Sequence, residues 1–147
     1  MDVRRYPSSR RFPWFNGPAL ERSLDGATIA YRHEEALGGR REPLPASGNA
    51  GWRVGQFRGY ADHMGSPEFR AALDRLAAEP RRACVMCAEA QWWRCHRRLL
   101  SDALVARGLE VLHLDARGKP QPHELTEFAV VEGDRVSYPP TQAELDV

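Results

Sequence analysis

The sequence predicts an α/β fold: a single domain with a mainly parallel, Rossmann-like sheet flanked by helices, and an irregular C-terminal hairpin tail. Short apolar runs alternate with amphipathic helical patterns, as in βαβ units. The length of 147 residues suits one core. No apolar run approaches the ~18 residues of a membrane span, and the N-terminus lacks the apolar segment of a signal peptide. We therefore expect one soluble, cytoplasmic domain over residues 1–147.

The first third of the chain is expected to hold two short strands and one helix. Residues 1–3 are interpreted as the end of a strand that opens onto a loop. Asn16 or Gly17 caps a short helix. Residues 28–31 are expected to form a strand, and residues 42–51, rich in Pro, Gly and Ser, a surface loop.

The clearest predicted helix follows Ser66, which is a suitable N-cap, with Pro67 at the first helical position. Its apolar residues recur at the i, i+3, i+4, i+7 spacing of one helix face. They are Phe69, Ala72, Leu73 and Leu76. Pro80 is expected to end the helix.

The central motif combines an expected strand over residues 83–86 with a helix over residues 94–107. In open α/β sheets, ligands bind beyond the carboxyl ends of strands, where helix N-termini also point their free N–H groups. A thiol, a carboxylate and an imidazole lie between the end of the expected strand and the first turn of the expected helix. Cys87, Glu89 and His96 are therefore the candidate catalytic residues.

The C-terminal part is expected to contain a strand over residues 109–114, ending at Asp115, and a hairpin over residues 128–138 around Gly133. If the strands are parallel, the segments after Asp2, Cys87 and Asp115 meet at one edge of the sheet. His123 is expected to be a surface or tail residue.

The three cysteines lie close together in the sequence, which is not the pattern of a fold held by disulfide bonds. Reduced thiols suit a cytosolic protein. Cys84, inside the strand, is expected to be buried and unreactive. Cys87, before a helix N-terminus, is either a thiolate nucleophile or a small packing residue. A zinc site with Cys84, Cys87, Cys95 and His96 is disfavoured, because strand and helix geometry would separate these ligands. A metal site with Cys87, Glu89 and His96 stays open, and no metal or cofactor is assigned.

Of the 21 basic residues, 20 are arginines, although the net charge is only +1. This net charge excludes a strong global attraction to nucleic acid or acidic membranes. Guanidinium groups suit bidentate binding of oxyanions. The candidate anion contacts are Arg4, Arg11, Arg58 and Arg97. The loop over residues 4–15 alternates arginines with aromatic residues, as a nucleic-acid surface or a lid over a nucleotide would.

Several motifs together resemble the family catalogued as domain of unknown function 488. They are Asp2-Val3-Arg4, residues 9–13, Leu37-Gly38-Gly39, residues 58–61, residues 86–89, residues 95–98 and residues 122–126. The resemblance implies a compact α/β fold with a site at these motifs, which adds Asp2 and Tyr60 as substrate contacts. It implies no established activity. Members usually begin with a strand and a helix before the Asp-Val-Arg segment, so either the start of this sequence is assigned too late or this unit is missing.

Two functions remain open from the sequence. The preferred one is a small cytoplasmic enzyme that acts on an anionic or nucleotide-like substrate at the carboxyl edge of the sheet. The alternative is a nucleic-acid-binding module that uses the loop over residues 4–15. A pocket joining Cys87 to arginines would favour the enzyme, and a continuous basic face would favour the module.

Overall fold

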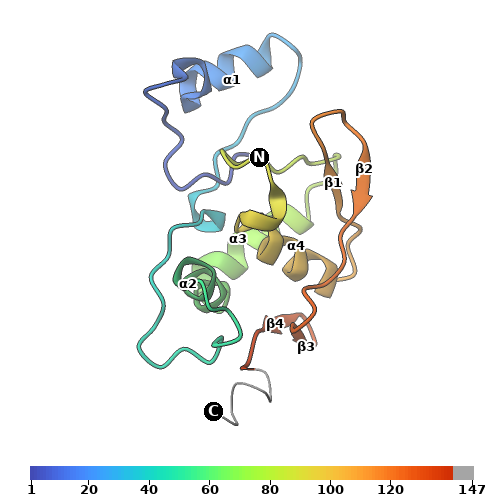
Figure 1. The fold of residues 1–147 in the computed structure, drawn as a ribbon. Coiled ribbons are helices and arrows are strands. Elements are labelled where there is room, and N and C mark those ends of the chain that lie inside the picture. Colours follow the sequence, from blue (N-terminus) through green and yellow to red (C-terminus); the bar gives the residue numbers. More distant parts are fainter. Residues whose placement is uncertain (141–147) are drawn as a thin grey trace.

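The computed structural model describes residues 1–140, which contain four α-helices, three short 3-10 helices and two hairpins (Figure 1). The α-helices are α1 (Gly17–Asp25), α2 (Gly55–Met64), α3 (Pro67–Ala77) and α4 (Arg97–Ala106). The 3-10 helices are η1 (Pro13–Phe15), η2 (Glu35–Leu37) and η3 (Trp92–Arg94). The strands are β1 (Leu112–Leu114), β2 (Pro120–Pro122), β3 (Val130–Glu132) and β4 (Arg135–Ser137). None of the helices in this part of the chain is long and apolar enough to cross a membrane.

The prediction of a mainly parallel, Rossmann-like sheet flanked by helices is wrong. In the described residues, β1 pairs with β2 and β3 with β4, both antiparallel, as two separate two-stranded sheets. Parallel pairing is limited to isolated bridges from Asp2 to His33 and to Met86. These bridges place three extended segments side by side without forming a regular sheet.

The side chain of Asp2 limits the pairing on the His33 side. The backbone N–H of Arg4 donates to Asp2 Oδ1 at 3.0 Å, so it is not available to a neighbouring strand. A short polar side chain thus competes with the ladder for a backbone donor. Beyond His33, the chain also enters η2 almost at once, so the pairing on this side has no room to extend.

Two other expected strands differ for local reasons. Thr28 has φ +61°, a left-handed conformation typical of a turn, and Ile29 is exposed, so residues 28–31 form no strand. The strand before Asp115 is present as β1, but its chain turns back. Asp115 Oδ1 accepts N–H groups from Arg117 at 2.8 Å and Lys119 at 2.9 Å, which closes the β1–β2 hairpin. An antiparallel partner replaces the expected parallel one.

The helix expected after Ser66 is confirmed as α3. Ser66 Oγ accepts the Phe69 N–H at 3.2 Å, and Pro67 is the first residue of the helix. The predicted apolar stripe is buried. The hairpin expected around Gly133 is also confirmed, because β3 and β4 flank a turn in which Gly133 has φ +64°.

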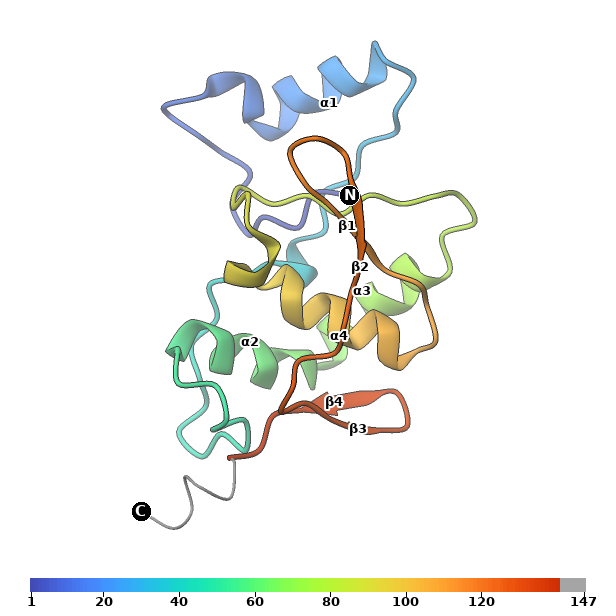
Figure 2. The same ribbon diagram turned by 45° about the vertical axis from the view of Figure 1, so that its right-hand side comes forward.

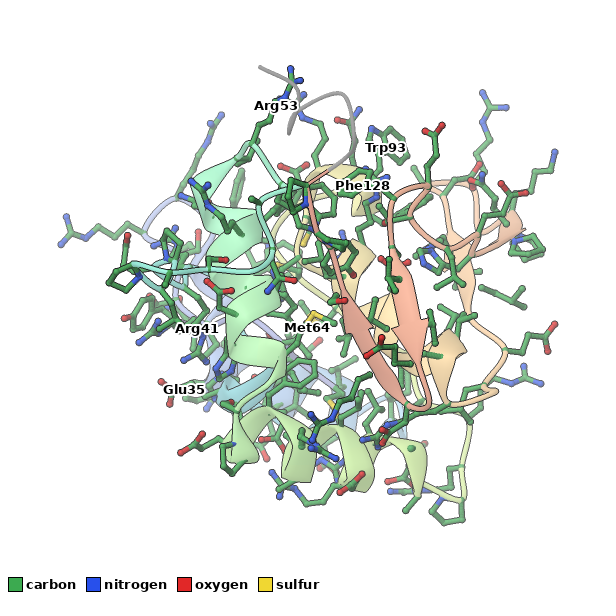
Figure 3. The ribbon with its side chains drawn as sticks, turned by 90° about the horizontal axis from the view of Figure 1, so that it is seen from below. Glu35, Arg41, Arg53, Met64, Trp93 and Phe128 are labelled. Atoms are coloured by element: carbon green, nitrogen blue, oxygen red, sulfur yellow. The ribbon has the colours of Figure 1, made fainter. Side chains whose placement is uncertain are left out.

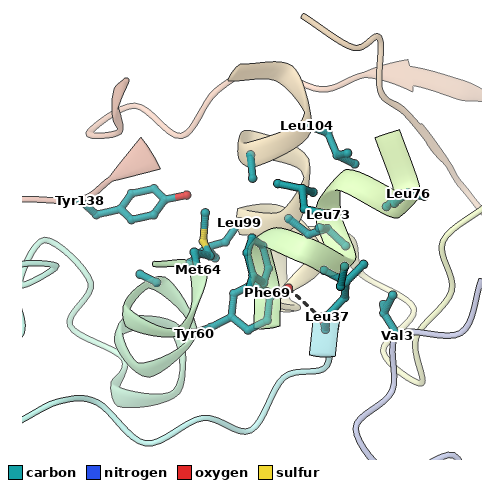
Figure 4. Close-up of a cluster of buried hydrophobic side chains, with 14 of the residues drawn as sticks. Val3, Leu37, Tyr60, Met64, Phe69, Leu73, Leu76, Leu99, Leu104 and Tyr138 are labelled. Atoms are coloured by element: carbon teal, nitrogen blue, oxygen red, sulfur yellow. Dashed lines mark hydrogen bonds between the residues drawn. The ribbon is translucent and has the colours of Figure 1, made fainter. Parts of the chain in front are cut away.

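The core lies between α2, α3 and α4 (Figure 4). Its largest fully buried side chains include Tyr60, Phe69, Leu99 and Tyr138. The Tyr60 hydroxyl donates to the Leu37 carbonyl at 2.9 Å, which attaches η2 to this core. Figure 3 shows the sulfur-bearing side chain of Met64 inside the molecule and Trp93 at its periphery.

A polar network joins the C-terminal hairpin region to α4. The Asp102 carboxylate accepts hydrogen bonds from His123 Nε2 at 2.8 Å, the Thr126 N–H at 2.9 Å and the Tyr138 hydroxyl at 2.7 Å. His123 is therefore buried, and its expected surface position is wrong. His113 Nε2 in turn donates to His123 Nδ1 at 2.8 Å.

The segment with η1 and α1 projects from the rest of the molecule in both ribbon views (Figure 2). Only Gly17 of α1 is buried. The preceding loop exposes large aromatic side chains, with Tyr6 at 58% and Trp14 at 61%. This segment therefore adds little to the core.

Candidate functional site

Hydrogen bonds around the N-terminus bring the Cys87 and His96 segments together. The Val3 N–H donates to the Met86 carbonyl at 3.0 Å, which fixes the chain immediately before Cys87. His96 Nε2 donates to the Val3 carbonyl at 3.1 Å. The segments of Asp2 and Cys87 therefore meet, as expected, although an isolated bridge rather than a sheet joins them.

Three side chains with reactive atoms form one cluster: Cys87, Cys95 and His96. Their two sulfurs and one imidazole nitrogen all lie within 4.8 Å of one another. Cys95 Sγ is 3.5 Å from His96 Nδ1. Because Nε2 carries the proton given to the Val3 carbonyl, the lone pair of Nδ1 is directed to the cysteine side.

The start of α4 makes this cluster possible. The helix begins at Arg97, three residues later than expected, and Arg94 belongs to η3. Cys95 and His96 lie between the two helices, so their side chains do not follow helical spacing. His96 is the N-cap residue but makes no side-chain capping hydrogen bond, which leaves its ring free to contact Cys95.

Cys87 is the acidic thiol of the pair. A hydrogen bond from the Cys95 side chain is the main cause that lowers the pKa of Cys87 to about 6, against the opposing effect of burial. The backbone N–H groups of Glu89 and Ala88 and the charge of Arg97 act in the same direction. At neutral pH most of Cys87 is therefore thiolate.

Cys95 is the protonated partner. Its hydrogen bond to Cys87, together with burial, raises the pKa of the Cys95 thiol far above its usual value. Arg97 Nε also donates to Cys95 Sγ at 3.5 Å, and the guanidinium donates to the Glu89 carbonyl. Arg97 thus holds the loop around the two sulfurs.

His96 is neutral at neutral pH. Burial lowers the pKa of His96 to about 4, with smaller contributions from the charges of Arg97 and Arg41. Gly39 packs against the ring, since a Cβ added there would lie 2.7 Å from His96 Nδ1. The neighbouring Gly38 is equally confined, because a Cβ there would lie 2.8 Å from the Arg5 Cα. The two glycines make room for the site.

The cluster opens into a cleft of about 410 Å³. Cys87, Glu89 and His96, the three predicted catalytic residues, all line it together with Cys95. The lining also includes the arginines Arg4, Arg5, Arg40 and Arg94. No ion pair with a carboxylate of residues 1–140 involves Arg5, Arg40 or Arg94. Arg5 Nη1 donates to the Arg40 carbonyl at 2.7 Å, so the three guanidinium groups lack carboxylate partners but Arg5 keeps one backbone contact.

Asp2 and Arg4, both predicted substrate contacts, bind each other. Arg4 Nε donates to Asp2 Oδ1 at 2.9 Å and Arg4 Nη2 to Asp2 Oδ2 at 2.6 Å. The Tyr31 hydroxyl also donates to Asp2 Oδ2, at 2.8 Å. Asp2 is fully buried and does not line the cleft. This bidentate pair supports the cleft wall.

The other predicted substrate contacts lie outside the cleft lining. Arg11 is exposed, with its guanidinium over the Phe12 ring at 5.2 Å. Arg58 lies on α2, and Tyr60 is fully buried in the core. The anion contacts predicted from the sequence did not include Arg5, Arg40 and Arg94, which line the cleft. Each of them lies next to a motif of the sequence: Arg5 follows Asp-Val-Arg, Arg40 follows Gly-Gly, and Arg94 precedes Cys-His. This position was the available signal.

Cys84 differs from its expected state. Because Cys84 is exposed, the prediction that it is buried is wrong. Its carbonyl accepts a hydrogen bond from the N-terminal ammonium group at 2.7 Å. The Cys87, Cys95 and His96 donors could also suit a soft ion such as Zn²⁺. Neither Cys84 nor Glu89 belongs to that donor set, and three donors are one fewer than a closed structural zinc site uses.

Comparison with known families gives one match. A family model described as "Domain of unknown function DUF488" matches residues 1–104. No curated protein and no solved structure matches the chain significantly. The matched range contains the whole cluster and all the arginines of the cleft.

Proposed function

The chain belongs to the DUF488 family, and on that premise we propose that it is an enzyme that uses the Cys87 thiolate on an anionic small-molecule substrate. The observation that carries the proposal is the position of Cys87 Sγ. It lies in a cleft with three arginines that pair with no carboxylate of residues 1–140, and it accepts hydrogen bonds that favour its charged form. A thiolate beside unpaired guanidinium groups suits nucleophilic attack on an anionic molecule.

Each group of the cleft has a distinct part in this proposal. Arg5, Arg40 and Arg94 bind the anionic group of the substrate through charge-assisted hydrogen bonds. Cys87 attacks the electrophilic atom. Glu89, whose exposed carboxylate lines the cleft and accepts the Gln91 N–H at 3.1 Å, is the candidate acid or base for the leaving group.

Competition labelling tests the proposal. The protein used carries Cys84→Ser, because the exposed Cys84 thiol would otherwise react with the label as well. Iodoacetamide at neutral pH should alkylate Cys87 well before Cys95, and inorganic phosphate should slow this reaction. Arg94→Ala should weaken the protection by phosphate roughly tenfold or more, since a charge-assisted hydrogen bond contributes about 1.5–3 kcal/mol. Arg22→Ala, on α1, is the matched control and should change nothing.

Slow and equal labelling of Cys87 and Cys95 would remove Cys87 as a nucleophile. Fast labelling that phosphate does not affect would keep a reactive thiol but separate it from the arginines.

A second candidate function is nucleic-acid binding by the loop over residues 4–15. Its support is the exposure of Tyr6, Phe12, Trp14 and Phe15 beside arginines, because exposed rings next to guanidinium groups can stack on bases. Fluorescence anisotropy with single-stranded DNA tests it. Binding that weakens with salt and is lost in Trp14→Ala would support this function, whereas binding unchanged by Trp14→Ala would contradict it.

A further inference from the structure

The proposed attack uses Cys95 only as a hydrogen-bond donor to the Cys87 thiolate and assigns no covalent step to its sulfur. Its side chain is buried, with 5% exposure, yet it contributes to the cleft lining. Its sulfur lies within 4.8 Å of Cys87 Sγ. A second thiol this close to a nucleophilic one can act on whatever bond the first one forms.

The two cysteines lie where the chain can bring their sulfurs together. Cys87 follows the isolated bridge of Met86, and Cys95 lies between η3 and α4, so neither is inside a regular strand or helix. Forming a disulfide requires the sulfurs to close to about 2.05 Å. Side-chain rotation and small loop movements can supply this without breaking α4.

The surroundings of Cys95 also provide a route for its proton. His96 Nδ1 lies 3.5 Å from Cys95 Sγ, and the Val3 carbonyl keeps this nitrogen unprotonated by binding Nε2–H. Arg97 Nε, at 3.5 Å, can stabilise the sulfur once it becomes a thiolate. Cys95 therefore has both an acceptor for its proton and a cation for the resulting charge.

The arginines of the cleft indicate the charge of the substrate. Arg5 Nε is buried and has no hydrogen-bond partner among the described residues. Arg40 is exposed, and within the described part of the chain the side chain of Arg94 makes one hydrogen bond, a 3.5 Å contact with Gln91 Oε1. Among residues 1–140, Glu89 is the one carboxylate that lines the cleft, and its contact with the Gln91 N–H holds it in the loop.

We propose that the cleft is a thiol–disulfide exchange site for small anionic disulfides, with Cys87 as the attacking thiol and Cys95 as the resolving thiol. This rests on the proposed function and names its substrate class. A disulfide whose ends carry carboxylates, such as oxidised glutathione, offers both the S–S bond that the thiolate attacks and the charges that the arginines bind.

The exchange balances in two steps. The Cys87 thiolate attacks one sulfur of the substrate, the substrate S–S bond breaks, and one thiolate leaves while the other half stays on Cys87 as a mixed disulfide. The Cys95 sulfur then attacks Cys87 Sγ, and the Cys95 proton, which faces His96 Nδ1, ends on a departing substrate thiolate. The Cys87–Cys95 bond forms and the second thiolate leaves. The substrate gains two electrons, the protein loses two, and excess small thiol reverses the reaction.

The test uses reduced Cys84→Ser protein and oxidised glutathione, with an acid quench and peptide mass spectrometry. The Cys84→Ser protein should form the Cys87–Cys95 disulfide with little mixed disulfide. Adding Cys95→Ala should trap glutathione on Cys87, and adding Cys87→Ala should prevent both products.

Bis(2-hydroxyethyl) disulfide, which has no charge, is the second probe. Arg94→Ala should slow the reaction with oxidised glutathione roughly tenfold and leave that with the neutral probe unchanged.

Different contrary results would overturn the disulfide exchange alone or the proposed function of Cys87 as well. A mixed disulfide that persists with Cys95 present would overturn the resolving role while leaving Cys87 a nucleophile. Equal effects of Arg94→Ala on both probes would overturn the anionic substrate class. A zinc ion held in stoichiometric amount by both thiols, and preventing disulfide formation, would overturn the exchange. Failure of Cys87 to react with either disulfide or with iodoacetamide would remove the proposed function as well.

Discussion

At the scale of single residues, one hydrogen bond defines the chemistry of His96. The Val3 carbonyl accepts Nε2–H, so Nδ1 is the free acceptor beside Cys95. Burial then keeps the ring neutral, with a pKa of about 4. His96 therefore offers Nδ1 as a hydrogen-bond acceptor to the Cys95 thiol but supplies no positive charge at neutral pH. Arg97 provides that charge instead.

Gly39 offers a direct test of this arrangement, because Gly39→Ala would place a Cβ 2.7 Å from His96 Nδ1. The imidazole would have to move, so we expect the free energy of unfolding to fall by roughly 1–3 kcal/mol. Gly48→Ala is the matched control, since a Cβ there would meet nothing within 4 Å. Thermal or denaturant unfolding measures both. Equal stability of the two variants would show that Gly39 does not confine the ring.

At the scale of elements, α4 joins the site to the C-terminal region. Its first turn follows Cys95 and His96, and Asp102, inside the helix, binds His123, Thr126 and Tyr138. His113 is connected through His123, and its ring stacks on Trp92 of η3 at 3.7 Å between centroids. The tail thus supports the same short helix that precedes Cys95.

Asp102→Asn tests this connection. An amide cannot accept all three hydrogen bonds, so each donor left unpaired should cost roughly 1–3 kcal/mol of the free energy of unfolding. Hydrogen exchange should also become faster in residues 123–138. Asp134→Asn is the control, because Asp134 is half exposed and lies 3.5 Å from Arg107, a pair for which we expect about 1 kcal/mol or less. Similar losses in both variants would contradict the structural role of Asp102.

At the scale of the whole molecule, the sequence predicted local elements better than their assembly. The cap at Ser66, the stripe of α3 and the turn at Gly133 are local signals, and all three are confirmed. The parallel sheet could not be excluded from apolar runs alone. Its absence among the described residues has several local causes, which include the Asp2 carboxylate that takes a backbone donor, the turn at Thr28 and the hairpin closed by Asp115.

For the site, too, local signals were predicted better than the assembly. Cys87, Glu89 and His96 line one cleft, although the sheet that was expected to bring them there is absent from the described residues. Cys95 was missed as their neighbour because a helix from Arg94 would have turned it away from His96. The later start of α4 removes that separation. Helix boundaries are among the least certain features of a sequence, and here three residues decide which side chains meet.

The pH dependence of Cys87 alkylation tests the central claim, that Cys87 carries the thiolate of the cleft, most directly. The rate constant for iodoacetamide in the Cys84→Ser protein should rise with pH, because only the thiolate reacts, and should reach its plateau above a midpoint of about 6. Cys95→Ala should move this midpoint upward, because the main hydrogen bond to the thiolate is lost. A midpoint near the ordinary thiol value of 9.0, unchanged by Cys95→Ala, would contradict the account.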